Sequence, residues 1–132
     1  MNTPLILYHI PNAAKAQQVL ALCKDLRFRA KPLTASDAGR TVGTLAGLPG
    51  AAANTQKAPA GYKLPELLIL SGLEGAALEF FLAAWKKAGI APVPLKAILT
   101  PHNANWQLYA LAEELQREHA AMLLYRQNPP KT

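Results

Sequence analysis

The sequence has few of the residues on which many protein classes depend. It contains one cysteine, Cys23, so no disulfide can form within the chain. The longest apolar runs, such as residues 67–70, are far shorter than the ~18 residues of a membrane-spanning helix. The motifs CxxC, HExxH and GxSxG are absent, and so are the glycine-rich phosphate loops. The sequence therefore predicts no membrane span, no metal site, no cofactor and no catalytic residue that a known motif would identify.

Charge is also scarce, since only 17% of the 132 residues are charged while 51% are hydrophobic. That balance excludes a disordered chain, and the length fits one domain. The N-terminus lacks the basic stretch and the small-residue cleavage site of a signal peptide, so a cytoplasmic protein is expected.

The formal net charge of +6 comes entirely from the first half of the chain. Residues 65–132 carry six basic and six acidic side chains, whereas residues 1–64 carry eight basic and two acidic ones. Half of those basic residues form a short cluster, the basic patch, made of Lys24, Arg27, Arg29 and Lys31. Such a patch can attract nucleic acid or an acidic partner, but charges on an edge strand also discourage unwanted strand pairing. Both interpretations stay open.

Hydrophobic periodicity predicts two βαβ units followed by a helix. The predicted strands are 5–10, 28–34, 66–72 and 92–100, and the predicted helices are 13–26, 36–48, 74–88 and 105–125. Asn12 is expected to cap the first long helix and Gly89 to end the third. Residues 49–64 are rich in Gly, Ala and Pro, which predicts a flexible loop within a single α/β domain.

We expect an α+β sandwich with a ferredoxin-like split βαβ repeat and an extra C-terminal helix. Strands one and three are the most apolar, so they should be central, with strands two and four at the edges. The alternative is a four-stranded parallel α/β sheet. Strand one is apolar on both faces, so the C-terminal helix, the middle helix or a second protomer must cover the second face.

The best candidate site is the polar elbow after the fourth strand, defined as residues 96–106. Its candidate ligand-binding residues are Lys96, Thr100, His102, Asn103, Asn105 and Trp106. Asn103 or Asn105 is expected to cap the last helix, and the free N–H groups of that helix start could hold a carboxylate or a phosphate. The alternative is purely structural: the asparagine caps, Trp106 packs and His102 is solvated.

Three further side chains have simpler interpretations. Cys23 lies on the apolar stripe of the first helix and is expected to be a small buried residue rather than a nucleophile. Trp85 is expected in the core. Phe80 lies off the apolar stripe of its helix, which suits a homodimer contact or docking of the middle helix.

The second half of the chain resembles a small bacterial family known as a domain of unknown function. The resemblance covers residues 65–119, and its most specific part is LKAILT, a polar elbow, Asn-x-Trp and a helix that ends in Glu-His. It implies a bacterial cytoplasmic protein and brings no activity with it. Our leading hypothesis is therefore a non-enzymatic ligand- or partner-binding or regulatory module, expected to be a homodimer. The alternatives are nucleic-acid binding through residues 24–31 and a small-molecule enzyme that uses Lys96 or His102.

Overall fold

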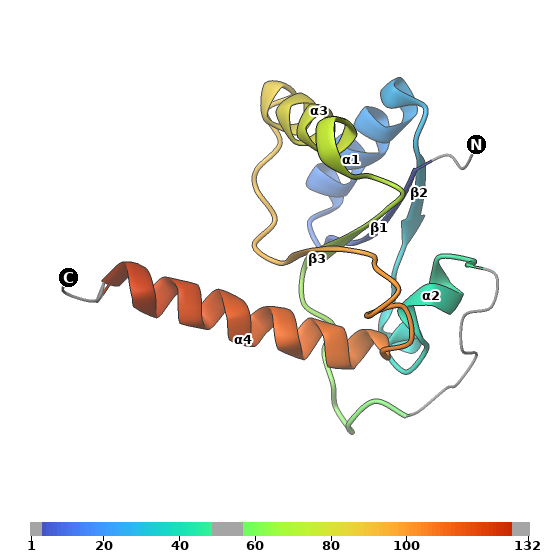
Figure 1. The fold of residues 1–132 in the computed structure, drawn as a ribbon, viewed down its shortest axis with the longest axis vertical. Coiled ribbons are helices and arrows are strands. Elements are labelled where there is room, and N and C mark those ends of the chain that lie inside the picture. Colours follow the sequence, from blue (N-terminus) through green and yellow to red (C-terminus); the bar gives the residue numbers. More distant parts are fainter. Residues whose placement is uncertain (1–3, 49–56, 128–132) are drawn as a thin grey trace.

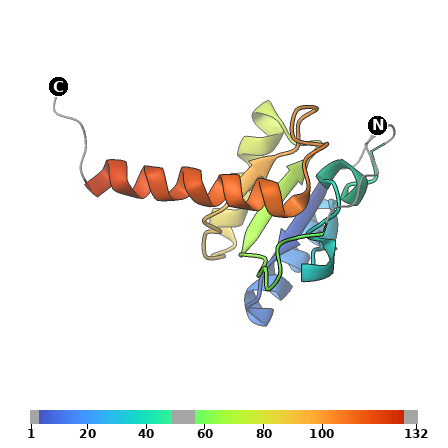
Figure 2. The same cartoon turned by 90° about the horizontal axis from the view of Figure 1, so that it is seen from below.

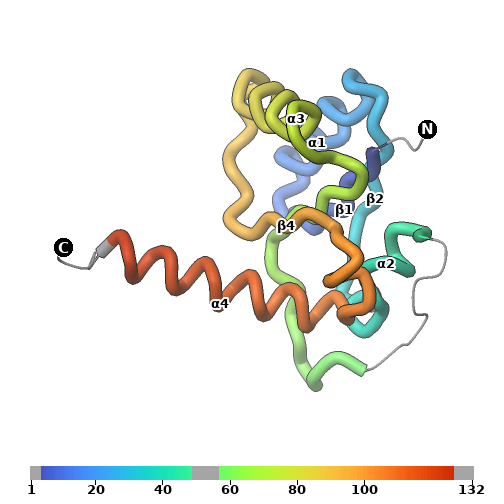
Figure 3. The backbone as a smooth tube through the Cα atoms, in the orientation of Figure 1, coloured from blue at the N-terminus to red at the C-terminus, as the bar shows by residue number. Residues whose placement is uncertain are grey.

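The structure is a computed structural model, and it describes residues 4–48 and 57–127 (Figure 1). The strands are β1 (Leu5–His9), β2 (Arg29–Pro32), β3 (Leu67–Ser71) and β4 (Lys96–Ile98). The helices are α1 (Ala13–Leu26), α2 (Val42–Leu45), α3 (Gly75–Lys87) and α4 (Leu108–Gln127), with a 3₁₀ turn, η1, at Ala35–Asp37. The tube in Figure 3 follows this order from the blue N-terminal strand to the red C-terminal helix.

The four strands form one mixed sheet in the order β2-β1-β3-β4. β1 is parallel to β2, β3 is parallel to β4, and the two central strands β1 and β3 are antiparallel. The predicted α+β class and the central position of strands one and three are confirmed. The antiparallel central pair shows that the alternative of a purely parallel sheet is wrong.

The expectation of a split βαβ repeat needs a correction, because each pair of parallel strands lies side by side. In a split unit a third strand would separate β1 from β2, whereas here Leu5 pairs directly with Arg29 and Ile6 with Ala30. Both arrangements put the same two apolar strands in the centre, so apolar content could not distinguish them. The sheet is instead two adjacent βαβ units joined along β1 and β3.

Side chains of the central strands alternate between two cores, as the strand period requires. On one face, Ile6 and Tyr8 pack with apolar residues of α1 and α3. On the other face, Leu5 and Leu7 pack with apolar residues of α2 and of the first half of α4. The sheet therefore lies between two layers of helices, and the C-terminal and middle helices supply the cover that the second face needs (Figure 2).

Local signals fix the ends of the first and third helices. The side chain of Asn12 accepts a hydrogen bond of 3.0 Å from the Lys15 N–H, so the predicted N-cap is confirmed. Gly89, with φ of 75°, follows the last turn of α3 as predicted. Arg27 caps α1 with φ of 61°, a left-handed conformation that favours glycine over any residue with a Cβ.

The fourth strand, expected at 92–100, is observed only at Lys96–Ile98, and the middle helix also differs from its prediction. The middle helix, expected at 36–48, consists only of η1 and the four residues of α2, and Gly39, Gly43 and Gly47 explain why it does not extend further. Within the predicted loop at 49–64, residues 57–64 contain no helix or strand, and residues 49–56 lie outside the described part of the chain.

Candidate binding site

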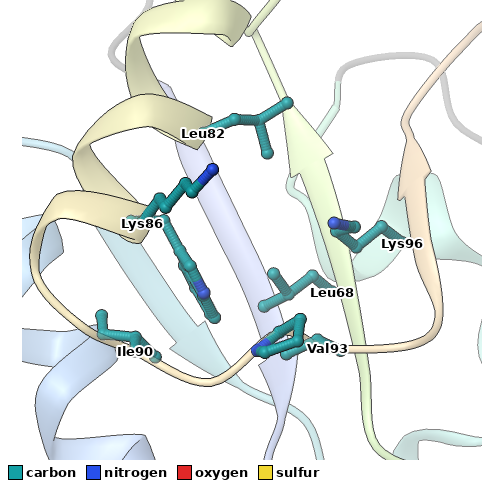
Figure 4. A pocket seen from close by; sticks show the side chains of 8 residues that line it. Leu68, Leu82, Lys86, Ile90, Val93 and Lys96 are labelled. Atoms are coloured by element: carbon teal, nitrogen blue, oxygen red, sulfur yellow. The ribbon is translucent and has the colours of Figure 1, made fainter.

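A pocket lies between α3 and the edge strand β4, on the face of the sheet that α1 and α3 cover (Figure 4). Its volume is about 350 Å³, within the ~300–1,000 Å³ of typical small-ligand sites. The lining is mostly apolar and comprises Leu68, Leu82, Trp85, Lys86, Ile90, Pro92, Val93 and Lys96. The pocket exists because α3 packs over β1 and β3 and leaves the same face of β4 without a helix above it.

The loop between α3 and β4 forms one wall of this pocket. After Gly89 ends the helix, the chain turns back so that Ile90 and Val93 are buried in the core beneath Trp85. The Trp85 indole N–H donates to the Ala91 carbonyl at 3.2 Å, and the Lys15 ammonium donates to the Pro92 carbonyl at 2.9 Å. These two bonds anchor the loop to α3 and to α1, so the wall is held from both sides.

Among the described residues, the charged groups in the lining are the ammonium groups of Lys86 and Lys96. Lys86 comes from the last turn of α3 and Lys96 is the first residue of β4, and the two side chains point toward each other across the pocket (Figure 4). Within residues 4–48 and 57–127, no carboxylate, imidazole, hydroxyl or thiol lines the pocket. The site therefore offers an apolar surface beneath two positive charges.

The elbow residues Thr100 and Asn103 bond to each other rather than to a helix. The Thr100 N–H donates to Asn103 Oδ1 at 2.9 Å, and the Asn103 N–H donates to Thr100 Oγ1 at 3.2 Å. Asn103 Nδ2 also donates to the Ile98 carbonyl at 3.0 Å. The prediction that Asn103 caps the last helix is therefore wrong: its side chain closes the turn after β4, and α4 begins only at Leu108.

The backbone at the start of α4 is bonded to the first half of the chain. The Leu108 and Tyr109 N–H groups donate to the carbonyls of Arg40 and Ala38, each at 2.9 Å. Val42 and Gly43 return hydrogen bonds to the carbonyls of Trp106 and Ala104. The helix start thus joins the two βαβ units, and the N–H groups of Leu108 and Tyr109 point at protein carbonyls instead of at a solvent-facing anion site.

Lys96 and His102 lie on opposite sides of the sheet. Lys96 lines the pocket beside Leu68 and Trp85, which belong to the core beneath α3. The exposed His102 ring meets Trp106 edge-on, with ring centroids 5.4 Å apart, and Trp106 packs against the core beneath α4. The structure therefore does not bring together the two residues of the enzyme hypothesis. Asn105 is exposed in the same turn, and the ligand-binding role of the elbow residues stays a prediction.

The basic patch lies at the end of α1 and along β2, which is an edge strand of the sheet. Lys24, Arg27, Arg29 and Lys31 are all exposed. The Lys31 ammonium donates to the Leu45 carbonyl at 2.9 Å, so this residue also ties β2 to the end of α2. The location agrees with the edge-strand interpretation, while nucleic-acid binding stays a prediction.

The remaining candidates from the sequence are core residues or surface residues. Cys23 is buried, and burial raises the pKa of its thiol to about 11, which suppresses the reactive thiolate. Trp85 is buried in the core beneath α3 as predicted, whereas Phe80 is 60% exposed. Within residues 4–48 and 57–127, no three His, Cys, Asp or Glu side chains gather closely enough to hold a metal ion. The helices of the same residues include none with the length and apolarity to cross a bilayer.

Sequence reasoning missed the pocket because its lining combines residues of β3, α3, the α3–β4 loop and β4, and no local pattern shows how these pack together. Lys96 was recognised, but it was grouped with its neighbours in the elbow. The available signal was the Lys86–Lys87 pair near the end of the predicted third helix, and it has no meaning until β4 is placed beside the helix.

Comparisons with known proteins give a family match over part of the chain but no activity. No curated protein and no solved structure gave a match. Residues 66–122, from the start of β3 to the exposed part of α4, match the family described as Domain of unknown function (DUF3783), which confirms the resemblance found in the second half of the sequence.

Proposed function

We propose that the protein is a non-enzymatic binding module whose site is the pocket between α3 and β4. The ligand would be a small molecule with an apolar body and one negatively charged group, such as a carboxylate attached to a hydrocarbon chain. The observation that carries this proposal is the composition of the lining, which is apolar apart from two lysines that converge from opposite walls.

The apolar lining would supply most of the affinity. Removing about 150–200 Å² of apolar ligand surface from water contributes roughly 4–5 kcal/mol. Each partly solvated contact between a lysine and an anion adds about 0.5–1 kcal/mol. After the cost of immobilising the ligand, a dissociation constant in the high micromolar to millimolar range follows for a simple probe.

The lysines would supply the selectivity. Two cations at the mouth of an apolar pocket favour an anionic head group and disfavour a cationic one by like-charge repulsion. The described residues of the lining include no carboxylate, imidazole or thiol that could act as a general acid or base, and this supports binding rather than catalysis.

The test uses octanoate, octanol and octylamine as probes, with thermal shift and titration calorimetry on the full chain. We expect octanoate to stabilise the protein, octanol to do so less, and octylamine not to do so, because stabilisation follows the affinity for the native state. Acetate, which lacks the apolar body, should have no effect at the same concentration.

Variants locate the site. The double variant Lys86→Gln with Lys96→Gln should weaken octanoate binding about five- to thirtyfold and leave octanol binding unchanged. Lys87→Gln is the matched control, because Lys87 is an exposed neighbour on the same turn that does not line the pocket. Equal binding of octanoate and octylamine, or an equal loss in the control, would refute the proposal.

A further inference from the structure

The outer end of α4, defined as residues 120–126, is apolar and exposed on every side. Every residue in it has an exposed side chain, and the sequence is AAMLLYR. The four large apolar side chains are 44–62% exposed: Met122, Leu123, Leu124 and Tyr125. Consecutive helical residues differ by ~100° around the axis, so these four surround the helix rather than form one stripe. A helix that is apolar all round is normally buried.

The inner half of the same helix shows the contrast. Leu108, Leu111, Ala112 and Leu115 are at most 9% exposed and pack against the sheet. α4 crosses this face of the sheet and then runs out past the other helices and strands, so no other described part of the chain lies beside its outer end (Figures 1 and 2). An exposed apolar surface of this kind is suited to packing against another molecule.

We propose that the outer ends of α4 from two copies of this chain pack against each other in antiparallel orientation. The face best suited to the contact carries Met122 and Tyr125, because their helical positions lie within about 60° of each other. This face continues the stripe that the inner half buries, so two helices can pair through it without leaving the sheet.

Charge complementarity selects a second copy and an antiparallel arrangement. The exposed Glu118 and Arg126 lie one turn before and one turn after Met122. An antiparallel pair centred on Met122 places Glu118 of each copy at the level of Arg126 of the other. A parallel pair would instead place the two Glu118 side chains side by side and the two Arg126 side chains side by side, which is unfavourable because like charges repel. The surface thus complements itself, as an isologous two-fold interface must.

The size of the contact predicts a reversible dimer. Residues 117–127 overlap over about 16 Å, at ~1.5 Å per residue. The paired ends alone form an interface at the low end of the sizes found for specific complexes. Association should therefore depend on protein concentration in the micromolar range, and it does not depend on the ligand pocket, which lies on the other face of the sheet.

Sedimentation equilibrium on the full chain from about 5 to 500 µM tests the dimer, since this range brackets the expected dissociation constant. Met122→Glu places two carboxylates together at the two-fold axis and should raise the dissociation constant at least about tenfold. Phe80→Glu is the control, because Phe80 is a similarly exposed apolar residue on α3 and should leave the dimer intact. Circular dichroism and the melting temperature of each variant verify that it is folded.

Charge reversal tests the orientation. Glu118→Arg alone and Arg126→Glu alone should each weaken the dimer several-fold, and the double reversal should restore it. Met122→Cys should form an intermolecular disulfide under mild oxidation, since the native Cys23 is buried. A monomer throughout the concentration range overturns the proposal. Dissociation by Phe80→Glu but not by Met122→Glu, failure of the double reversal, or binding of the outer end to lipid vesicles in place of self-association would also overturn it.

Discussion

Replacing Phe81 with alanine should destabilise the protein strongly, while the same change at Phe80 should have almost no effect. The two residues are neighbours on α3 and have identical side chains. Phe81 is 0% exposed in the core between α1, α3 and the sheet, whereas Phe80 is 60% exposed. The pair therefore isolates burial from helix propensity and side-chain chemistry.

The magnitude follows from what Phe81 contacts. Its ring lies 5.9 Å from the Phe28 ring and 6.1 Å from the Trp85 ring, measured between centroids. Truncation of a buried phenylalanine to alanine costs about 3–5 kcal/mol, and loss of two aromatic contacts puts this site in the upper part of that range. For a chain of this length the melting temperature should fall by roughly 12–20 °C. Phe80→Ala should change the free energy of unfolding by at most about 0.5 kcal/mol.

Urea unfolding followed by circular dichroism measures both variants at low micromolar concentration, where association does not contribute. The midpoint of Phe81→Ala should fall while its m-value stays that of the wild type, because the unfolded surface is unchanged. Phe81→Leu should lie between the two, at about 1–2 kcal/mol. Equal losses at the two positions, or a larger loss at Phe80, would refute the assignment of α3 to this orientation.

Three further predictions concern single groups. The Cys23 thiol has its pKa raised from 9.0 to about 11 in the folded state. The unfolded chain therefore loses this proton first, and stability should fall by roughly 1.4 kcal/mol per unit between pH 9 and 11. Cys23→Ala should remove that part of the slope in pH-dependent urea unfolding, and an unchanged slope would contradict it. The buried Tyr62 hydroxyl has no hydrogen-bond partner among the described residues, so Tyr62→Phe should raise the free energy of unfolding by about 1 kcal/mol rather than lower it. Arg27 has a left-handed backbone conformation at the end of α1, which glycine adopts without strain. Arg27→Gly should therefore raise the free energy of unfolding by about 0.5–1 kcal/mol in the same assay, whereas Arg27→Ala should not raise it.

Much of the fold could be predicted because local signals agree with the tertiary structure. The first helix was predicted at 13–26 and is observed at Ala13–Leu26, since Asn12 starts it and its apolar stripe is continuous. The central position of β1 and β3 was predicted, but which of them each edge strand pairs with was not, because that pairing depends on how the chain returns after β2. The apolar side chains on both faces of residues 5–10 predict that both faces are covered, but they do not indicate whether β1 lies next to β2.

The candidate site was predicted less well, for a physical reason. The elbow contains polar residues because a strand must end and a helix must begin there, and Thr100 and Asn103 bond to each other to achieve this. A pocket, in contrast, is a property of the space between elements. Lys86 and Lys96 face each other only because α3 and β4 pack with a gap above the edge strand.

The junction of the two βαβ units has a consequence for the order of folding. Within each unit about 20–25 residues separate the end of one parallel strand from the start of the next, while nearly 60 separate β1 from β3. Closing a loop almost three times longer costs about 1 kcal/mol more in chain entropy. Pairing β1 with β3, the two most buried strands, thus costs the most chain entropy. We expect each unit to collapse around its own helix first and the antiparallel seam between β1 and β3 to form last in the folding of this chain.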